Sequence, residues 1–208
     1  MLTATAERRP KRKGRRDVRS AILRAARRLY FAHGTAGVTA RRIATAVGVS
    51  PTAIYLYFRN LGDVLEHLRM EGHGLLADAL RAVDPEQLAV ERVRGMGRAY
   101  YAFGVANPRY YELMFHFGRV ERPRRAAVQQ EMYTLLLLRD AVQRGVDRGE
   151  IRKDLDPMVM TNALWSQIHG VTALAVSGLL LATAAGHHAE VLEGVLESSV
   201  HWLLPEHR

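Results

Sequence analysis

Hydroxyl and guanidinium side chains concentrate between residues 39 and 59, where they could bind an anionic partner. Tyr55 and Tyr57 follow the small residues Thr52 and Ala53, and arginines lie nearby on both sides. Small residues let a backbone approach the edges of bases, and tyrosine and arginine side chains can reach phosphate oxygens. Ordinary packing is the alternative for the two tyrosines. The pattern indicates nucleic-acid binding if the local structure presents these side chains together.

Two short helices with a glycine-containing turn between them are predicted to carry these side chains. Thr39 can cap the first helix, and Gly48 stands where that helix must turn. Ser50 is a preferred cap and Pro51 a preferred first residue, so we expect the second helix to run from Pro51 to Phe58. Two short helices joined in this way form a helix-turn-helix unit, whose second helix can enter the major groove of DNA.

A longer helix over residues 17–33 is predicted to supply the core beneath this unit. Its apolar residues recur at intervals of three and four, and Gly34 follows where the helix should end. The partners that would pack against it are Ile43, Ala44, Val47, Val49, Ile54 and Phe58. The side chains left outside this core are the predicted DNA contacts: Thr39, Arg41, Arg42, Ser50, Pro51, Thr52, Ala53, Tyr55, Tyr57 and Arg59.

The segments on either side of this unit could add phosphate contacts. Asn60 and Asp63 can cap a further helix, whose N–H groups would offer a phosphate site. A basic arm runs from Arg8 to Arg16, and such arms often bind nucleic acid once it is present. The alternative for the arm is a disordered tail that only aids solubility.

The charge of the chain is divided unevenly along its length. The first 69 residues hold 15 lysines and arginines against 4 aspartates and glutamates, and the remainder holds 15 against 17, within a formal net charge of +9. One domain that meets a polyanion accounts for this division better than a general need for solubility. An anionic membrane surface is the alternative polyanion, and the helix-turn-helix pattern favours DNA.

Length and composition predict a folded protein of a reducing compartment. The chain has 208 residues, of which 48% are hydrophobic, so it can bury a core in one or two domains. Cysteine is absent, which makes the cytoplasm the default location. We expect no export signal, and the apolar run over residues 171–185 is shorter than the roughly 18 to 20 residues that span a bilayer.

Residues past Leu65 are predicted to be helical throughout, because proline or glycine separates segments of helical length. Three pairs place a capping residue before proline: Asp84-Pro85, Asn107-Pro108 and Asp156-Pro157. The expected helices cover residues 60–83, 85–106, 108–117, 123–148, 157–177 and 187–204. The fold class is therefore all-α, with a three-helix helix-turn-helix domain, a C-terminal helical bundle and about nine helices in total.

The C-terminal bundle has an aromatic and methionine-rich interior that could bind a small molecule. Apolar bundles with a few convergent polar groups are common ligand sites. The candidates are Tyr100, Phe103, Tyr110, Met114, Phe115, Trp165 and His169. Core packing is the alternative for Trp165, and a hydrogen bond to a buried carbonyl is the alternative for His169. The histidines form no metal-ligand pattern, and we expect neither a metal site nor a cofactor.

Residues 18–65 resemble the DNA-binding domain of the TetR family of repressors. The resemblance rests on Thr39-Ala40-Arg41-Arg42-Ile43-Ala44, Gly48-Val49-Ser50 and Ile54-Tyr55-Leu56-Tyr57-Phe58. Two positions depart from the family pattern, since Leu56 and Leu61 stand where polar or basic residues are common, and Arg59 could replace the lost charge. Trp165, His169 and Gly170 resemble the C-terminal domain of one TetR branch, and Gly170 would permit close helix approach.

The resemblance implies a basic arm over residues 1–16, a DNA-binding domain over 17–64 and a ligand-sensing, dimerising domain over 65–208. TetR-like regulators usually dimerise through their last two helices and bind a palindromic double-stranded DNA operator. A small apolar or aromatic effector would release the operator, although activators share this architecture. The competing hypotheses are an enzyme with a vestigial DNA-binding domain, which lacks a catalytic motif, and a basic peripheral membrane protein.

Overall fold

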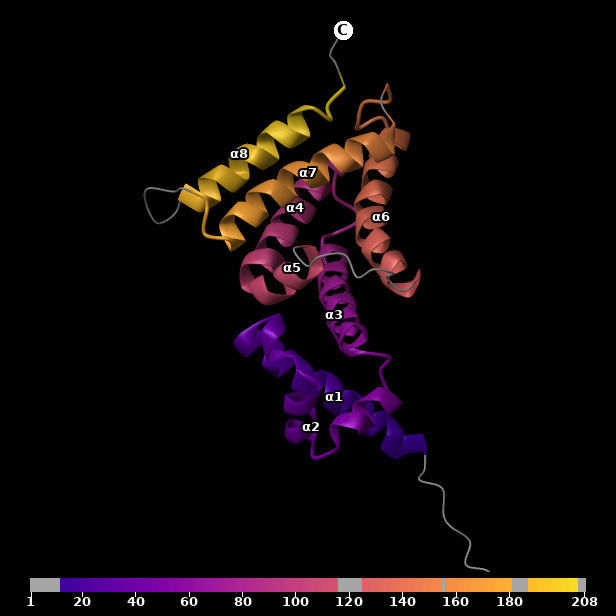
Figure 1. Ribbon diagram of the computed structural model, residues 1–208. Coiled ribbons are helices and arrows are strands. Elements are labelled where there is room, and N and C mark those ends of the chain that lie inside the picture. Colours follow the sequence, from indigo (N-terminus) through magenta and orange to yellow (C-terminus); the bar gives the residue numbers. More distant parts are fainter. Residues whose placement is uncertain (1–11, 116–124, 155, 181–186, 206–208) are drawn as a thin grey trace, which may run out of the picture. The chain divides into compact units, whose positions relative to one another are not determined.

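The computed structural model describes residues 12–115, 125–154, 156–180 and 187–205, and the regular structure in these ranges is helical (Figure 1). This confirms the all-α fold class. In chain order the elements are α1 (Arg12–His33), the 3-10 helix η1 (Thr35–Gly37), α2 (Ala40–Val47), the 3-10 helix η2 (Pro51–Leu56), α3 (Leu61–Arg81), α4 (Ala89–Ala106), α5 (Pro108–Phe115), α6 (Arg125–Asp147), α7 (Pro157–Val176) and α8 (His187–His201).

The chain divides into two compact units at a point inside α3. The first unit ends at Leu68 and is called the head below, and the second begins at Arg69 and is called the body. Residues 1–11 of the predicted basic arm lie outside the described residues, while residues 12–16 form the start of α1, which begins five residues earlier than expected.

The core of the head forms where α1 packs against α2 and η1, and where α2 packs against η2. Its best-buried large side chains are Ile22, Tyr30, Ile43, Ile54 and Phe58. Ala44 is also buried, as its small size at the helix crossing predicts. Val47 and Val49 were expected in the core but are only partly buried, because they flank the turn at the end of α2.

The turn between α2 and η2 has the predicted caps. Thr39 Oγ1 accepts from the Arg42 amide at 3.2 Å, and Ser50 Oγ accepts from the Ala53 amide at 3.2 Å. Gly48 takes the left-handed conformation, with φ of 79°, and its amide donates to the Ala44 carbonyl at 2.9 Å. A residue with a side chain is strained in that conformation, so glycine is required at this position.

The helix predicted over residues 51–58 is instead a 3-10 helix that ends at Leu56. The amide of Ala53 donates to the Ser50 carbonyl, and that of Tyr57 to the Ile54 carbonyl, both at 3.0 Å and three residues apart. A segment this short has few intrahelical bonds to gain from α geometry, so the tighter i to i+3 pattern can replace it.

The body is organised around α4, which packs against α5, α6, α7 and α8. Helices α7 and α8 lie side by side (Figure 1). Glycines let α4 approach its neighbours, because a Cβ at Gly97 would collide with Leu196 and one at Gly104 with Thr172. Gly170, where close approach was predicted, has no such neighbour among the described residues.

The predicted start of α4 at Pro85 is wrong, since the helix begins at Ala89. Asp84 accepts from the Glu86 amide at 2.9 Å and so stabilises a turn. The amide of Ala89 donates to Glu150 Oε2 at 2.5 Å, across 61 positions in sequence. A tertiary contact therefore caps α4, and no local signal could have shown it.

The starts predicted at the other two prolines are correct. Asp156 Oδ1 accepts from the Met158 and Val159 amides at 2.7 and 3.2 Å, which caps α7. Helix α5 begins at Pro108, but the side-chain amide of Asn107 donates back to the Phe103 carbonyl at 3.0 Å, at the end of α4. At the C-terminus, α8 ends at His201, three residues before the predicted end.

Candidate functional site

The head presents most of its predicted DNA contacts to solvent. Exposed side chains are those of Arg41, Arg42, Ser50, Pro51, Thr52, Tyr55 and Arg59, while Thr39, Ala53 and Tyr57 are partly buried. They come from α2, η2 and the residues beside them, so the capped turn brings both helices' polar side chains into one unit. Thr39 and Ser50 use their hydroxyl oxygens as caps, which fixes the backbone on which the other groups stand.

Leu56 is 68% exposed beside Tyr55, which is 50% exposed. The second helix of the helix-turn-helix, residues 51–58, is called the recognition segment below, and an apolar side chain exposed on such a segment can contact a thymine methyl group. The resemblance to the TetR family marked Leu56 only as a departure from the family pattern, so this contact was not predicted. The sequence did contain a signal for this contact: Leu56 is apolar, although Ile54 already supplies the buried side chain of η2.

The start of α3 is capped by its own side chains. Asn60 Oδ1 accepts from the Asp63 amide at 2.8 Å, and Asp63 Oδ2 accepts from the Arg59 amide at 2.9 Å. The predicted caps are therefore present, and they already bind two of the amides near the predicted phosphate site. Asp63 is only 4% exposed, so its carboxylate lies within the head.

Arg19 joins α1 to the end of the recognition segment. Its Nη2 lies 2.5 Å from Nε2 of His67, and its guanidinium lies 5.0 Å from the centroid of the Phe58 ring. His67 Nδ1 in turn lies 2.7 Å from the Asp63 carbonyl. The sequence gives no local signal for this role of Arg19, because Phe58 and His67 are more than 30 residues away.

The body encloses a cavity of about 270 Å³. Four predicted ligand residues line it, namely Tyr100, Met114, Phe115 and Trp165, whereas Phe103, Tyr110 and His169 do not. Phe103 and Tyr110 are buried in the surrounding core, and Tyr110 lies close to Gly72. The predicted set is thus brought together only in part around the cavity.

His169 lies behind Tyr100, outside the described wall of the cavity. Its Nδ1 lies 2.8 Å from the Tyr100 hydroxyl and 2.9 Å from the Tyr111 hydroxyl. Tyr111 also donates to the His169 carbonyl at 3.2 Å. Burial raises the pKa of Tyr100 to about 12 and also raises that of Tyr111, so both hydroxyls keep their protons at neutral pH.

The analysis of the sequence missed cavity residues from three other helices. They include His73 of α3, Thr134 and Leu138 of α6, and Ser199 of α8. His73 is 3% exposed, and burial, followed by the nearby Arg69, lowers its pKa to about 4. His73 precedes Leu76 by three residues and Leu80 by seven, so the sequence alone could have placed it on the same buried helix face, although this signal is weak.

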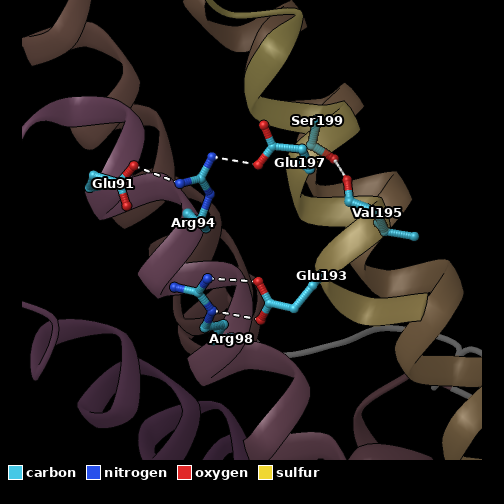
Figure 2. Close-up of polar contacts among 7 residues, drawn as sticks. All are labelled: Glu91, Arg94, Arg98, Glu193, Val195, Glu197 and Ser199. Atoms are coloured by element: carbon cyan, nitrogen blue, oxygen red, sulfur yellow. Dashed lines mark hydrogen bonds and ion pairs between the residues drawn. The ribbon is translucent and has the colours of Figure 1, made fainter. Parts of the chain in front are cut away.

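Two arginines of α4 form ion pairs with glutamates of α8 (Figure 2). Arg94 bonds Glu91 at 2.6 Å and Glu197 at 2.8 Å, and Arg98 bonds both carboxylate oxygens of Glu193 at 2.8 and 2.7 Å. The hydrogen bond from Arg98 holds the pKa of Glu193 below its usual range. These pairs lie between α4 and α8, two of the helices that line the cavity.

The outer side of α7 and α8 carries an apolar groove without a described charged side chain. Its lining includes Leu174 and Val191, which are 44% and 38% exposed, together with Gly170 and Gly194. Among the residues that the structure describes, a Cβ at either glycine would meet nothing within 4 Å.

No helix in the described ranges is long and apolar enough to cross a bilayer. No group of three or more histidine, aspartate or glutamate side chains is arranged there to hold a metal ion.

A capped helix-turn-helix with exposed hydroxyl and guanidinium groups, joined to a separate helical body with a cavity, defines a DNA-binding regulator. A family model described as "Bacterial regulatory proteins, tetR family" matches residues 22–68, and one described as "Tetracyclin repressor-like, C-terminal domain" matches residues 93–198. The chain belongs to the TetR family, whose members are transcriptional regulators and not enzymes. Assignment to the branch with Trp165, His169 and Gly170 stays a prediction.

Individual relatives agree with this family. The chain is 27% identical over 161 residues to the HTH-type transcriptional regulator Rv1816 of Mycobacterium tuberculosis, covering 73% of this chain and 68% of that protein. It is 25% identical over 186 residues to the HTH-type transcriptional repressor AcnR of Corynebacterium glutamicum, covering 86% and 88%.

Solved structures share the fold. A protein of unknown function from Rhodococcus sp. RHA1 has a TM-score of 0.79 at 25% identity and covers 90% of this chain and 96% of its own. A tetR family regulatory protein from Rhodococcus RHA1 has a TM-score of 0.69 at 19% identity, covering 91% and 98%.

Proposed function

We propose that the protein is a cytoplasmic repressor, a homodimer that holds a palindromic operator until a small apolar or aromatic molecule enters the body. The observation that carries the proposal is the capped turn between α2 and η2, which presents Thr52, Tyr55 and neighbouring arginines from one rigid unit. The relative AcnR, which is named a repressor, supports this sign of regulation.

The recognition segment would enter the major groove with its small residues first. Thr52 and Ala53 would lie nearest the base edges, and the hydroxyl of Tyr55 would reach a phosphate oxygen. Arg41 and Arg42, in the first turn of α2, would contact the backbone that this helix crosses.

The outer groove of α7 and α8 would form the dimer interface. Leu174 and Val191 would be buried there, and Gly170 and Gly194 would let the helices of a second copy approach closely. A two-fold dimer could place two recognition segments on half-sites about 34–36 Å apart.

The cavity of the body would bind the effector. A ligand weakens operator binding only if it binds better to the conformation that holds DNA less well. Tyr100, Met114, Phe115 and Trp165 would form the apolar contacts.

Fluorescence anisotropy with duplexes from the region upstream of the coding sequence tests the proposal. We expect nanomolar affinity, two chains per palindrome, and a loss of about tenfold or more in Tyr55→Ala. Tyr133→Ala in the body, where Tyr133 is 40% exposed, is the matched control and should bind normally. Equal affinity for a scrambled duplex would contradict the recognition segment, and lower expression of the target in cells that contain the protein distinguishes a repressor from an activator.

A further inference from the structure

The 3-10 geometry of η2 arranges its side chains in rows. A 3-10 helix has three residues per turn, so side chains three positions apart lie on the same face. Ile54 faces the core of the head, where it is 0% exposed. Ala53 and Leu56 form a second row, and Thr52 and Tyr55 form a third. Apart from Ala53, which is partly buried, the members of these two rows are exposed, so a partner can reach both.

The two accessible rows differ in chemistry. Thr52 and Tyr55 carry hydroxyl groups, which can bond to base edges and to phosphate oxygens. Ala53 and Leu56 have hydrocarbon side chains, and Leu56 is the more accessible of the two, at 68% exposed. One row can therefore bond to DNA through polar groups, whereas the other needs an apolar partner.

The major groove offers such an apolar partner at one of the four bases. Thymine presents a C5-methyl group there, beside the hydrogen-bond donors and acceptors that the base pairs display. Phosphate groups are charged and hydrated, so a leucine side chain gains nothing against them. Contact between leucine and the methyl group removes apolar surface of both from water, which is favourable. An exposed leucine on a segment that enters the groove is therefore matched to thymine.

We propose that Leu56 is a specificity-determining residue, which contacts the C5-methyl group of a thymine in each half-site of the operator. Ala53 lies in the same row, nearer the start of η2, and its small side chain lets the segment approach the base edges. The inference rests on the operator binding proposed above and names the chemical feature of the operator that this row reads.

A uracil scan of the operator tests the contact. Each thymine of a duplex that the full chain binds is replaced in turn by deoxyuridine, in both half-sites, and the affinity is measured by fluorescence anisotropy. Uracil pairs as thymine does but lacks the methyl group. We expect at least one replacement to weaken binding about 15-fold, since each lost methyl contact costs about fourfold and two half-sites are changed. A scan in which no replacement weakens binding by more than about twofold would overturn the inference.

The variant Leu56→Ala assigns the contact to this side chain. At the thymine that Leu56 reads, the ratio of thymine to uracil affinity should fall from about 15 to about 1 to 2, because the contact is already lost. A change in DNA flexibility caused by uracil would lower the affinity of both proteins equally and would leave the ratio high. Leu56 is exposed, so its truncation leaves the core of the head in place. An unchanged ratio at every thymine would overturn the inference.

Two further variants distinguish this contact from the other contacts of the protein. Leu88→Ala shortens a leucine of the body that is 66% exposed, and both the affinity and the ratio should stay unchanged. Tyr55→Ala should weaken binding to both duplexes and keep the ratio, because its hydroxyl group bonds to phosphate. Loss of the ratio in Tyr55→Ala together with an unchanged ratio in Leu56→Ala would assign the methyl contact to Tyr55 and overturn the role of Leu56.

These outcomes separate the role of Leu56 from the proposed function. If the protein prefers its operator to a scrambled duplex and Tyr55→Ala weakens that binding, but uracil has no effect, only the role of Leu56 is wrong. If the protein binds a scrambled duplex equally well, the proposed operator binding is wrong, and the role of Leu56 falls with it.

Discussion

The head and the body differ in how they use charge. Residues 1–68, which form the head, hold 14 lysines and arginines against 4 acidic residues, and several of these arginines are exposed around the capped turn. The described cavity wall of the body has no such residue. The head can attract a polyanion from a distance, whereas the described cavity wall of the body consists of apolar, aromatic and uncharged polar side chains. The two regions are therefore suited to different kinds of partner.

Salt provides the largest expected difference between the two regions. Raising KCl from 50 to 200 mM should lower operator affinity about 500-fold if a site neutralises about five phosphates. The affinity of the body for an uncharged aromatic probe such as 2-naphthol should change less than about twofold, because binding of an uncharged molecule releases no counterions from the probe. Anisotropy and calorimetry at four salt concentrations measure both. An operator affinity that does not respond to salt would remove the distinction.

Acid should destabilise the body through His73. The ordinary histidine pKa is 6.5 and that of folded His73 is about 4, so between these values the unfolded chain binds a proton that the folded chain excludes. Stability from this group is therefore present above pH 6.5 and is lost as the pH falls toward 4, by about 3 kcal/mol in total. Urea unfolding at pH 7.5, 5.5 and 4.5 measures it. The free energy of unfolding of wild type should fall by about 2.5 kcal/mol relative to that of His73→Leu between pH 7.5 and 4.5, and a constant difference would contradict the burial of His73.

Two glycine-to-alanine substitutions in the body distinguish the loss of close helix packing from the gain in helix propensity. Gly104→Ala should cost about 2 kcal/mol, because the new methyl group would collide with Thr172. Gly74→Ala is the matched control in α3, where a Cβ meets nothing within 4 Å, and it should stabilise by about 0.5–1 kcal/mol. Urea unfolding at pH 7.5 compares them. Equal effects would show that α4 does not depend on a close approach at Gly104.

The arginine pairs on the surface of the body should give the smallest effect. Arg98 and Glu193 are each about half exposed, so water and salt screen their attraction. A double-mutant cycle with Arg98→Ala and Glu193→Ala should give a coupling energy of about 0.5 kcal/mol, which falls further at high salt. A coupling energy several times larger would show that exposed ion pairs contribute substantially to the stability of the body.

The head was predicted well because its signals are local. Thr39, Gly48, Ser50 and Asn60 act on amides or turns within a few residues, so their spacing in the sequence is enough to place them. The exception is Arg19, whose contact with His67 spans 48 positions. The 3-10 geometry of η2 was also missed, since caps predict where a helix begins but not how tightly it winds.

The body was predicted in outline, because apolar periodicity and proline starts define helices but not their partners. Glu150 caps α4 from 61 positions away, and Gly97 and Gly104 rather than Gly170 allow close packing. The cavity wall shows the same limit. Its aromatic members were found by composition, while His73 and Ser199 became visible only when six helices were placed together.

The cavity joins parts of the chain that are far apart in sequence, since His73 and Val200 both line it. An occupant would therefore act as a reversible cross-link among α3 to α8. Such a link opposes the transient openings through which backbone amides exchange their hydrogens with water. Exchange would slow most for amides whose exposure requires two helices that both contact the occupant to separate. The amides that exchange more slowly with the occupant bound would therefore identify the part of the body that it stabilises.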